Sequence, residues 1–303
     1  MKNLITILLL SIVLFACEKT VTIKIPDNGR KLTINSFFQQ DSSFSVSLTK
    51  SRYIMDGKYE FDNVENADIN LFENDNLIEK LGETNPGVYK SNFIPTENNN
   101  YRIEVSSTDF PMAQAQSFMP EKTEIIDIST SESFDEYGNP GTAFKVKFKD
   151  KPNIDSYYFV NVNKRINFSY YDEDEGTDVE STYTQAEDIY SEDPIVFQED
   201  WGLTAGLLVS GELINGREYT LSFETSGYYY YDGHEPDNES NTTYFVYLHS
   251  ISKDYYLYYK SLSKHKEAQD EFFMEPVQVY NNIENGFGIF AGFSTAVDSV
   301  KVE

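Results

Sequence analysis

One residue of the chain, Cys17, carries a thiol, and its position indicates covalent modification. An apolar run over residues 4–15 and then Ala16 precede it, and Lys2 supplies a positive charge at the start. The run is shorter than the roughly 20 residues that cross a bilayer, and a cysteine directly after such a segment is typical of a lipoprotein signal peptide. We therefore expect residues 1–16 to be removed and Cys17 to be acylated.

Residues that could act as a nucleophile or bind zinc lack the partners that these chemistries need. The segment 292–296 (Gly-Phe-Ser-Thr-Ala) imitates a nucleophile elbow, but no histidine follows Ser294, as it would in an α/β-hydrolase. The three histidines, His234, His249 and His265, lie far apart, and none belongs to a His-Glu-x-x-His motif. Sequence alone selects no carboxylate pair for glycoside hydrolysis among 50 acidic residues. The sequence predicts a non-enzymatic protein, with no catalytic residue.

Three carboxylates are candidate calcium ligands. Asp172, Asp174 and Asp178 surround Gly176 and could offer oxygen atoms to Ca²⁺. The segment lacks the bidentate glutamate and the flanking helices of an EF-hand, and a solvated acidic loop explains the same residues. We expect no other cofactor.

A tyrosine tract is the strongest candidate for a binding surface. Tyr228, Tyr229, Tyr230 and Tyr231 are consecutive, so on a strand two rings would point to each face. A turn with His234 and Asp237 follows, and Trp201 is the only tryptophan. Exposed Tyr and Trp anchor many contacts with sugars, peptides and proteins. The alternative is a barrel wall that is packed on both sides.

Composition restricts the partners and the fold class. The formal net charge of −26 repels nucleic acid, and a single cysteine allows no internal disulfide. Tyr and Phe dominate an aromatic content of 15%, which favours strands over helices. We expect a mainly β protein that is held together by packing alone.

The pattern along the chain predicts two β regions after a lipidated spacer over residues 17–30. Apolar residues alternate with polar ones at Leu32 and Ile34, and the rhythm continues to about Pro120, which predicts an immunoglobulin-like β-sandwich over residues 31–120. Residues 121–303 predict a larger antiparallel β domain, sandwich or barrel-like, in which Phe144 and Val146 begin a similar alternation.

Two loops and one helix complete the expected elements. The acidic segment 172–178 and the polar stretch 182–193 are predicted to be loop tips because they are too charged to bury. Apolar residues at three-and-four spacing predict one amphipathic helix near residues 251–273, with Ser252 as its N-cap and Pro276 beyond its end.

Several segments together resemble a family of Bacteroidetes outer-membrane lipoproteins that is described as domain of unknown function 4249. The similar segments are 17–19, 32–35, 87–89, 100–105 and, most specifically, 275–294. Alternating glycines in the last of these are typical of a strand that another backbone approaches closely. The resemblance implies an outer-membrane lipoprotein, often encoded beside TonB-dependent transporters, without established catalytic residues.

These observations predict a lipid-anchored envelope protein. The first function hypothesis is an accessory or docking subunit of an outer-membrane transporter or related envelope assembly. The alternative is a glycan- or peptide-binding lipoprotein that uses the tyrosine-rich surface. We expect the outer membrane as the location, on either its periplasmic face or the cell surface.

Overall fold

The computed structural model describes residues 29–57, 59–134, 138–152, 155–172, 176–197, 206–225, 242–270 and 274–302. Within them the chain forms seventeen β-strands, one α-helix and two short 3-10 turns, η1 (Ile54–Asp56) and η2 (Gly211–Leu213). The expected fold class, mainly β with one helix, is confirmed. Because the chain has no disulfide framework, the architecture depends on how these strands bury their apolar faces.

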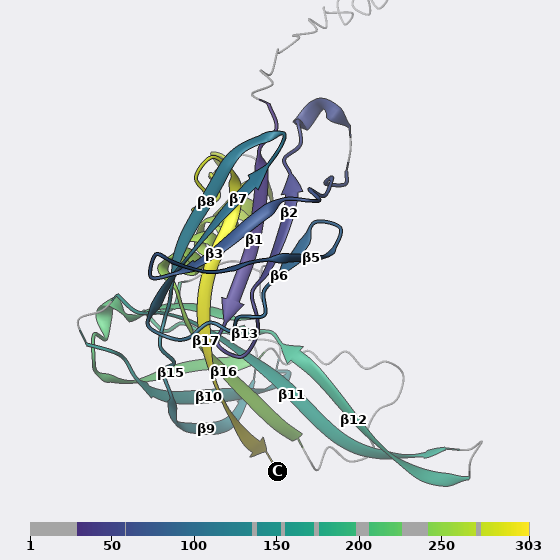
Figure 1. The fold of residues 1–303 in the computed structure, drawn as a ribbon. Helices are drawn as coiled ribbons and strands as arrows, with labels where there is room; N and C mark the ends of the chain where they lie inside the picture. Colours follow the sequence, from purple (N-terminus) through teal and green to yellow (C-terminus); the bar gives the residue numbers. More distant parts are fainter. Residues whose placement is uncertain are drawn as a thin grey trace, which may run out of the picture.

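The largest sheet has nine strands and runs through the whole molecule (Figure 1). Its order is β12-β11-β16-β17-β1-β2-β6-β5, with β14 beside β11. The bounds are β12 (Thr177–Glu187), β11 (Tyr157–Asp172), β16 (Thr242–Ile251), β17 (Phe287–Val302), β1 (Leu32–Gln39), β2 (Ser45–Lys50), β6 (Val88–Lys90), β5 (Gly82–Asn85) and β14 (Leu207–Ser210).

Strand β17 joins the two halves of this sheet. Its first part, from Phe287 to Phe293, pairs in parallel with β1, and its second part, from Phe293 to Val302, pairs antiparallel with β16. A strand of sixteen residues is about 50 Å long, so β17 reaches from one end of the molecule towards the other. The last strand of the chain therefore completes both halves.

Two smaller sheets cover the halves of the large sheet and form two sandwiches. The first has the order β4-β3-β7-β8 and the second the order β13-β15-β10-β9. Their bounds are β3 (Asp68–Glu73), β4 (Asn76–Lys80), β7 (Asn99–Ser107), β8 (Phe110–Met119), β9 (Ile125–Phe134), β10 (Pro140–Lys149), β13 (Ile189–Tyr190) and β15 (Glu218–Thr225).

Each sandwich has its own hydrophobic core, as alternating patterns require. In the first, Ile34 and Ile103 are fully buried, and Phe290 of β17 belongs to the same cluster. In the second, Val146 and Val246 are fully buried. The predicted inward faces of β1 and β10 are confirmed.

Helix α2 (Lys253–Asp270) lies on the outer face of the large sheet, where the two sandwiches meet. The Ser252 Oγ accepts a hydrogen bond from the Tyr255 amide at 3.3 Å, which confirms the predicted N-cap. Tyr255 packs edge-on against Phe37 of β1 and Phe293 of β17, with ring centroids 5.1 and 5.9 Å apart. In the described part of the chain, no helix is long and apolar enough to span a bilayer.

The predicted loop over residues 182–193 is wrong. Strand β12 continues to Glu187, and β13 follows at Ile189. An edge strand can be largely polar, because backbone hydrogen bonds to one neighbour hold it, here through eleven register pairs with β11. In the segment 172–178, Asp172 ends β11, Thr177 begins β12 and Gly176 has a φ of 67°, whereas residues 173–175 lie outside the described residues.

Candidate functional sites

Most of the predicted binding residues lie outside the described residues. They are Cys17, Asp174, Trp201, Tyr228, Tyr229, Tyr230, Tyr231, His234 and Asp237. Of the candidate calcium ligands, Asp172 is the last residue of β11, and Asp178 is exposed on β12 opposite Tyr171. Within the described ranges, no three His, Cys, Asp or Glu side chains come together as a metal site.

Ser294 has a structural position. Its side chain is fully buried in β17, and its Oγ donates a hydrogen bond to the Pro120 carbonyl at 2.8 Å. This bond joins β17 to the end of β8, at the border of the two sandwiches. The serine is buried, and its hydrogen-bond partner is a backbone carbonyl in place of the histidine that a nucleophile elbow would require.

His249 forms a hydrogen-bonded line across three strands of the large sheet. Its Nδ1 lies 2.8 Å from Thr295 Oγ1, and its Nε2 lies 2.8 Å from Asn161 Oδ1. The ring stacks on Phe159 and on Tyr247, with centroids 5.7 and 6.1 Å apart. Burial lowers the pKa of His249 to about 4, so the imidazole is neutral at pH 7 and a weak base. The distance between Thr295 and His249 resembles that of a nucleophile and its base. Together with Asn161, however, these side chains link three neighbouring strands and stabilise the sheet.

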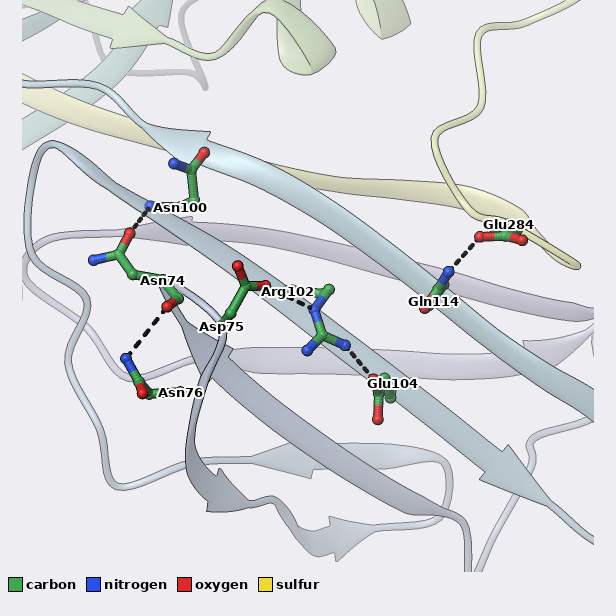
Figure 2. Close-up of polar contacts among 8 residues, drawn as sticks. All are labelled: Asn74, Asp75, Asn76, Asn100, Arg102, Glu104, Gln114 and Glu284. Atoms are coloured by element: carbon green, nitrogen blue, oxygen red, sulfur yellow. Dashed lines mark hydrogen bonds and ion pairs between the residues drawn. The ribbon is translucent and has the colours of Figure 1, made fainter.

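A shallow polar groove lies on the outer face of the first small sheet (Figure 2). The turn between β3 and β4 forms one side, because Asn74 and Asp75 adopt left-handed φ values of 46° and 67°. The Asn74 Oδ1 accepts a hydrogen bond from the Asn100 amide of β7 at 3.1 Å. This bond holds the turn beside the strand that supplies the centre of the groove.

Arg102 of β7 is that centre. Its guanidinium lies 3.9 Å above the Phe72 ring, pairs with Glu104 on the same strand, and lies 3.7 Å from Asp75 Oδ1. A pocket of about 170 Å³ is lined by Asn74, Asp75, Asn100, Arg102 and Gln116 of β8. Guanidinium, amide and carboxylate groups on one rigid face can exchange hydrogen bonds with a small polar ligand.

The sequence pattern assigns residues 100–105 to a strand and to the family resemblance, but it predicts no binding site there. The signal was present, because Asn100, Arg102 and Glu104 share one face of β7 while Tyr101 and Ile103 point to the core. The groove also needs the β3–β4 turn, about 25 residues earlier in the chain, and that contact has no local signature.

A second hollow, of about 700 Å³, lies on the outer face of the second small sheet. The exposed Lys145 of β10 lies between Ser129 of β9 and Ser222 of β15 in the strand register. Tyr190 of β13, which is 45% exposed, and Glu224 of β15 line the same hollow. This face combines a cation, hydroxyls and an aromatic ring.

The third feature is a ribbon formed by β11 and β12, which projects from the body in Figure 1. The pairing of β11 with β16 ends at Ile166, whereas its pairing with β12 continues to Asp172. The register places Ile166 opposite Tyr183, and Phe168 opposite Ser181, on the same face. The Tyr183 side chain is 43% exposed. In the described part of the chain, β12 pairs with β11 alone.

The fold and these surfaces define a mainly β protein of two sandwiches that share one strand. The chain belongs to the family described as a domain of unknown function, DUF4249, whose family model matches residues 18–299. The predicted family is thereby confirmed. No curated protein matches the chain.

Proposed function

We propose that this protein is a non-enzymatic, lipid-anchored protein of the outer membrane that docks onto a larger envelope assembly, such as a transporter. The anchor is supported by the position of Cys17 after an apolar run. Twelve peptide steps separate Cys17 from Gly29, where the described chain begins, and they can span up to about 40 Å. Such a link would allow the body to lie up to that distance from the anchor.

The projecting ribbon is the observation that carries the docking proposal. A two-stranded ribbon is marginally stable in water by itself, and its free edge is a template for another strand. Six residues of β11 lie beyond the last pair with β16, which is about 20 Å of ribbon. The face with Phe168 and the exposed Tyr183 offers apolar area beside that edge. A partner strand could pair with β12 and cover these side chains.

A matched pair of variants tests the ribbon. Tyr183→Lys places a charge on the ribbon, and Tyr190→Lys makes the same change at nearly equal exposure on β13. We expect the wild-type chain and Tyr190→Lys to co-purify with a larger envelope protein after mild detergent extraction, and Tyr183→Lys to lose it. A wild-type chain that elutes alone, even after cross-linking in intact cells, would refute docking.

A separate measurement tests the anchor. Intact mass of the wild-type protein from its native host should show acyl chains on a chain that begins at Cys17. Cys17→Ser should remove that mass and release the protein from the membrane fraction. A wild-type mass without acyl chains would refute the lipid anchor. It would not affect the proposal that the ribbon docks onto a partner.

A second candidate function, recognition of a glycan or peptide, is favoured by the groove at Arg102. Its volume is below the roughly 300 to 1,000 Å³ of sites for drug-sized ligands, so it could accept one sugar ring or one side chain. The guanidinium is held by Phe72, Asp75 and Glu104, which limits its loss of entropy on binding. The tyrosine tract over residues 228–231 remains a prediction for the same function.

Calorimetry against panels of oligosaccharides and peptides tests this candidate. Arg102→Ala should abolish binding at the groove, whereas Tyr229→Ala with Tyr231→Ala should abolish binding at the tyrosine tract. Arg165→Ala is a control, because Arg165 also stacks on a ring, that of Phe245 at 4.4 Å, but outside the groove. Binding that all these variants retain would refute both surfaces.

A further inference from the structure

The loop between β2 and β3 lies beside the point where the described chain begins (Figure 1). The backbone amide of Ser51 donates to the Lys31 carbonyl at 2.8 Å, and the amide of Lys31 donates to Ser51 Oγ at 3.0 Å. The Arg30 guanidinium also pairs with Asp56 of the loop at 2.6 Å. The loop is therefore fixed to the segment that leads back towards Cys17.

Large apolar side chains of this loop are strongly exposed. Tyr59 is 95% exposed, Met55 66% and Phe61 54%. Phe287, the first residue of β17, is 44% exposed and pairs with Thr33 at the same end of the molecule. Transferring such side chains out of water is favourable. Their grouping at one end of the molecule therefore indicates a surface that contacts an apolar partner.

Basic side chains accompany the aromatic rings at this end. Arg52 lies 4.3 Å from the ring centroid of Phe61, Lys31 lies 5.2 Å from that of Phe287, and Arg30 lies 5.6 Å from that of Tyr53. Of the three loop carboxylates, Asp56 forms an ion pair with Arg30 and Asp62 forms one with Lys50, while Glu60 is exposed. In a chain with a net charge of −26, a cluster of cations and aromatic rings is a local exception.

This combination matches the chemistry of a phospholipid surface. Aromatic rings favour the boundary between headgroups and acyl chains, long basic side chains reach from there to phosphates, and anionic lipids attract the cations. Twelve peptide steps span at most about 40 Å, so an anchored Cys17 would keep this end within that distance of the bilayer.

We propose that the described part of this loop, residues 51–57 and 59–63, together with Lys31 and Phe287, is a membrane-contact patch that enters the headgroup region of the leaflet holding the Cys17 acyl chains. The proposal rests on the proposed lipid anchor. The patch fixes the orientation of the body: the β1 end faces the bilayer, and the ribbon at the other end of β17 points away from it.

Single-cysteine labelling tests the patch, because acylation of Cys17 consumes the only native thiol. Tyr59→Cys and Met55→Cys each provide a thiol in the loop, to which an environment-sensitive fluorophore is attached. Phe134→Cys, at 63% exposure in the second sandwich, is the matched control for Met55 at 66%. Each acylated protein is reconstituted into vesicles of phosphatidylethanolamine and phosphatidylglycerol that contain a lipid-attached quencher.

We expect a blue shift and severalfold quenching at positions 55 and 59, and neither at position 134. Replacing the vesicles by pure phosphatidylcholine, or Arg52→Glu in the labelled Tyr59→Cys chain, should weaken the quenching. Unquenched probes at 55 and 59 in a protein whose mass shows the acyl chains would overturn the patch alone. A mass without acyl chains would overturn the anchor and the patch together. If the fluorophores at positions 55 and 59 are shielded from water only when an envelope extract is added, and not in pure lipid vesicles, the loop binds a protein partner.

Discussion

Gly288 allows β17 to lie directly against β1. Its φ is 112°, which side chains other than glycine rarely adopt, and a Cβ there would overlap the carbonyl oxygen of Ile34. Gly292 has a similar role, since a Cβ would lie 2.8 Å from the Phe118 carbonyl oxygen. The predicted close approach of another backbone to these glycines is confirmed. The glycine-rich C-terminal motif is thus a packing requirement.

Gly288→Ala should therefore lower the free energy of unfolding by roughly 3 kcal/mol, through strained φ and displacement of β1. Gly82→Ala is the control, because an added Cβ at Gly82 would meet no atom within 4 Å. Urea unfolding of both variants measures the difference. Equal midpoints for the two variants would show that β17 can move away from β1 without cost.

The second residue-scale prediction concerns pH. Burial lowers the pKa of His249 from 6.5 to about 4. Above pH 6.5 the ring is neutral in both states and has no effect, whereas between pH 6.5 and 4 only the unfolded chain gains the proton. Acid therefore favours unfolding, by up to roughly 3 kcal/mol once the pH is below 4.

His249→Gln should flatten the loss of unfolding free energy between pH 6.5 and 4, measured by urea unfolding at successive pH values. His265→Gln, at the other described histidine, which contacts the Val277 carbonyl, is the control for replacing a histidine elsewhere in the chain. If both variants keep the wild-type slope, His249 does not contribute to acid sensitivity.

At the scale of elements, strands with one buried face were predictable from alternation. Val146 and Phe148 of β10 are fully buried, as their spacing indicates, and Ser252 caps the predicted helix. Strand β12 was not predicted because apolar residues do not alternate regularly along it. Its strand conformation depends on pairing with β11. Propensity and periodicity report burial, and an edge strand with mostly exposed residues gives neither signal.

The groove at Arg102 was not predictable for a different reason. Its residues come from a turn and two strands, and the turn and Gln116 are about 40 residues apart in sequence. Tertiary pairing of β3 with β7 and of β7 with β8 brings them together. The surface residues that sequence did single out, the tyrosine tract and Trp201, lie outside the described residues and remain predictions.

Asp254 connects helix α2 to two other elements, which gives an element-scale prediction. Its Oδ2 accepts a hydrogen bond from Ser117 of β8 at 2.7 Å, and its Oδ1 accepts one from the Tyr280 hydroxyl at 2.8 Å. Burial and this carboxylate raise the pKa of Tyr280, so the hydroxyl stays a donor.

Asp254→Ala should cost about 2 to 3 kcal/mol of unfolding free energy, since it leaves two hydroxyl donors without their charged acceptor. Asp254→Asn keeps an acceptor oxygen and should cost less. Hydrogen exchange of the α2 amides, compared between the two variants, shows whether the helix loosens from the sheet. Unchanged exchange in Asp254→Ala would mean that aromatic packing alone holds α2.

At the scale of the molecule, the two sandwiches share strand β17, whereas independent domains would have no strand in common. Phe290 of β17 lies in the first core, while Val300 and Val302 of the same strand pack against the second. Hydrogen bonds cross the border, from Ser294 to Pro120 and from the Thr123 amide to the Ser250 Oγ at 3.1 Å. Unfolding either sandwich would remove the partner strand of the other.

We therefore predict one cooperative unfolding transition for the whole chain, although the sequence predicts a boundary near residue 120. Ile34→Ala creates a cavity in the first core, and Val146→Ala creates one in the second. Each variant should speed hydrogen exchange of the most protected amides in both sandwiches, because these exchange only through global unfolding. Leu77→Ala, at a side chain that is 62% exposed, should change neither. Faster exchange that stays within the mutated half, or two separate calorimetric transitions, would instead show that β17 leaves one sandwich while the other remains folded.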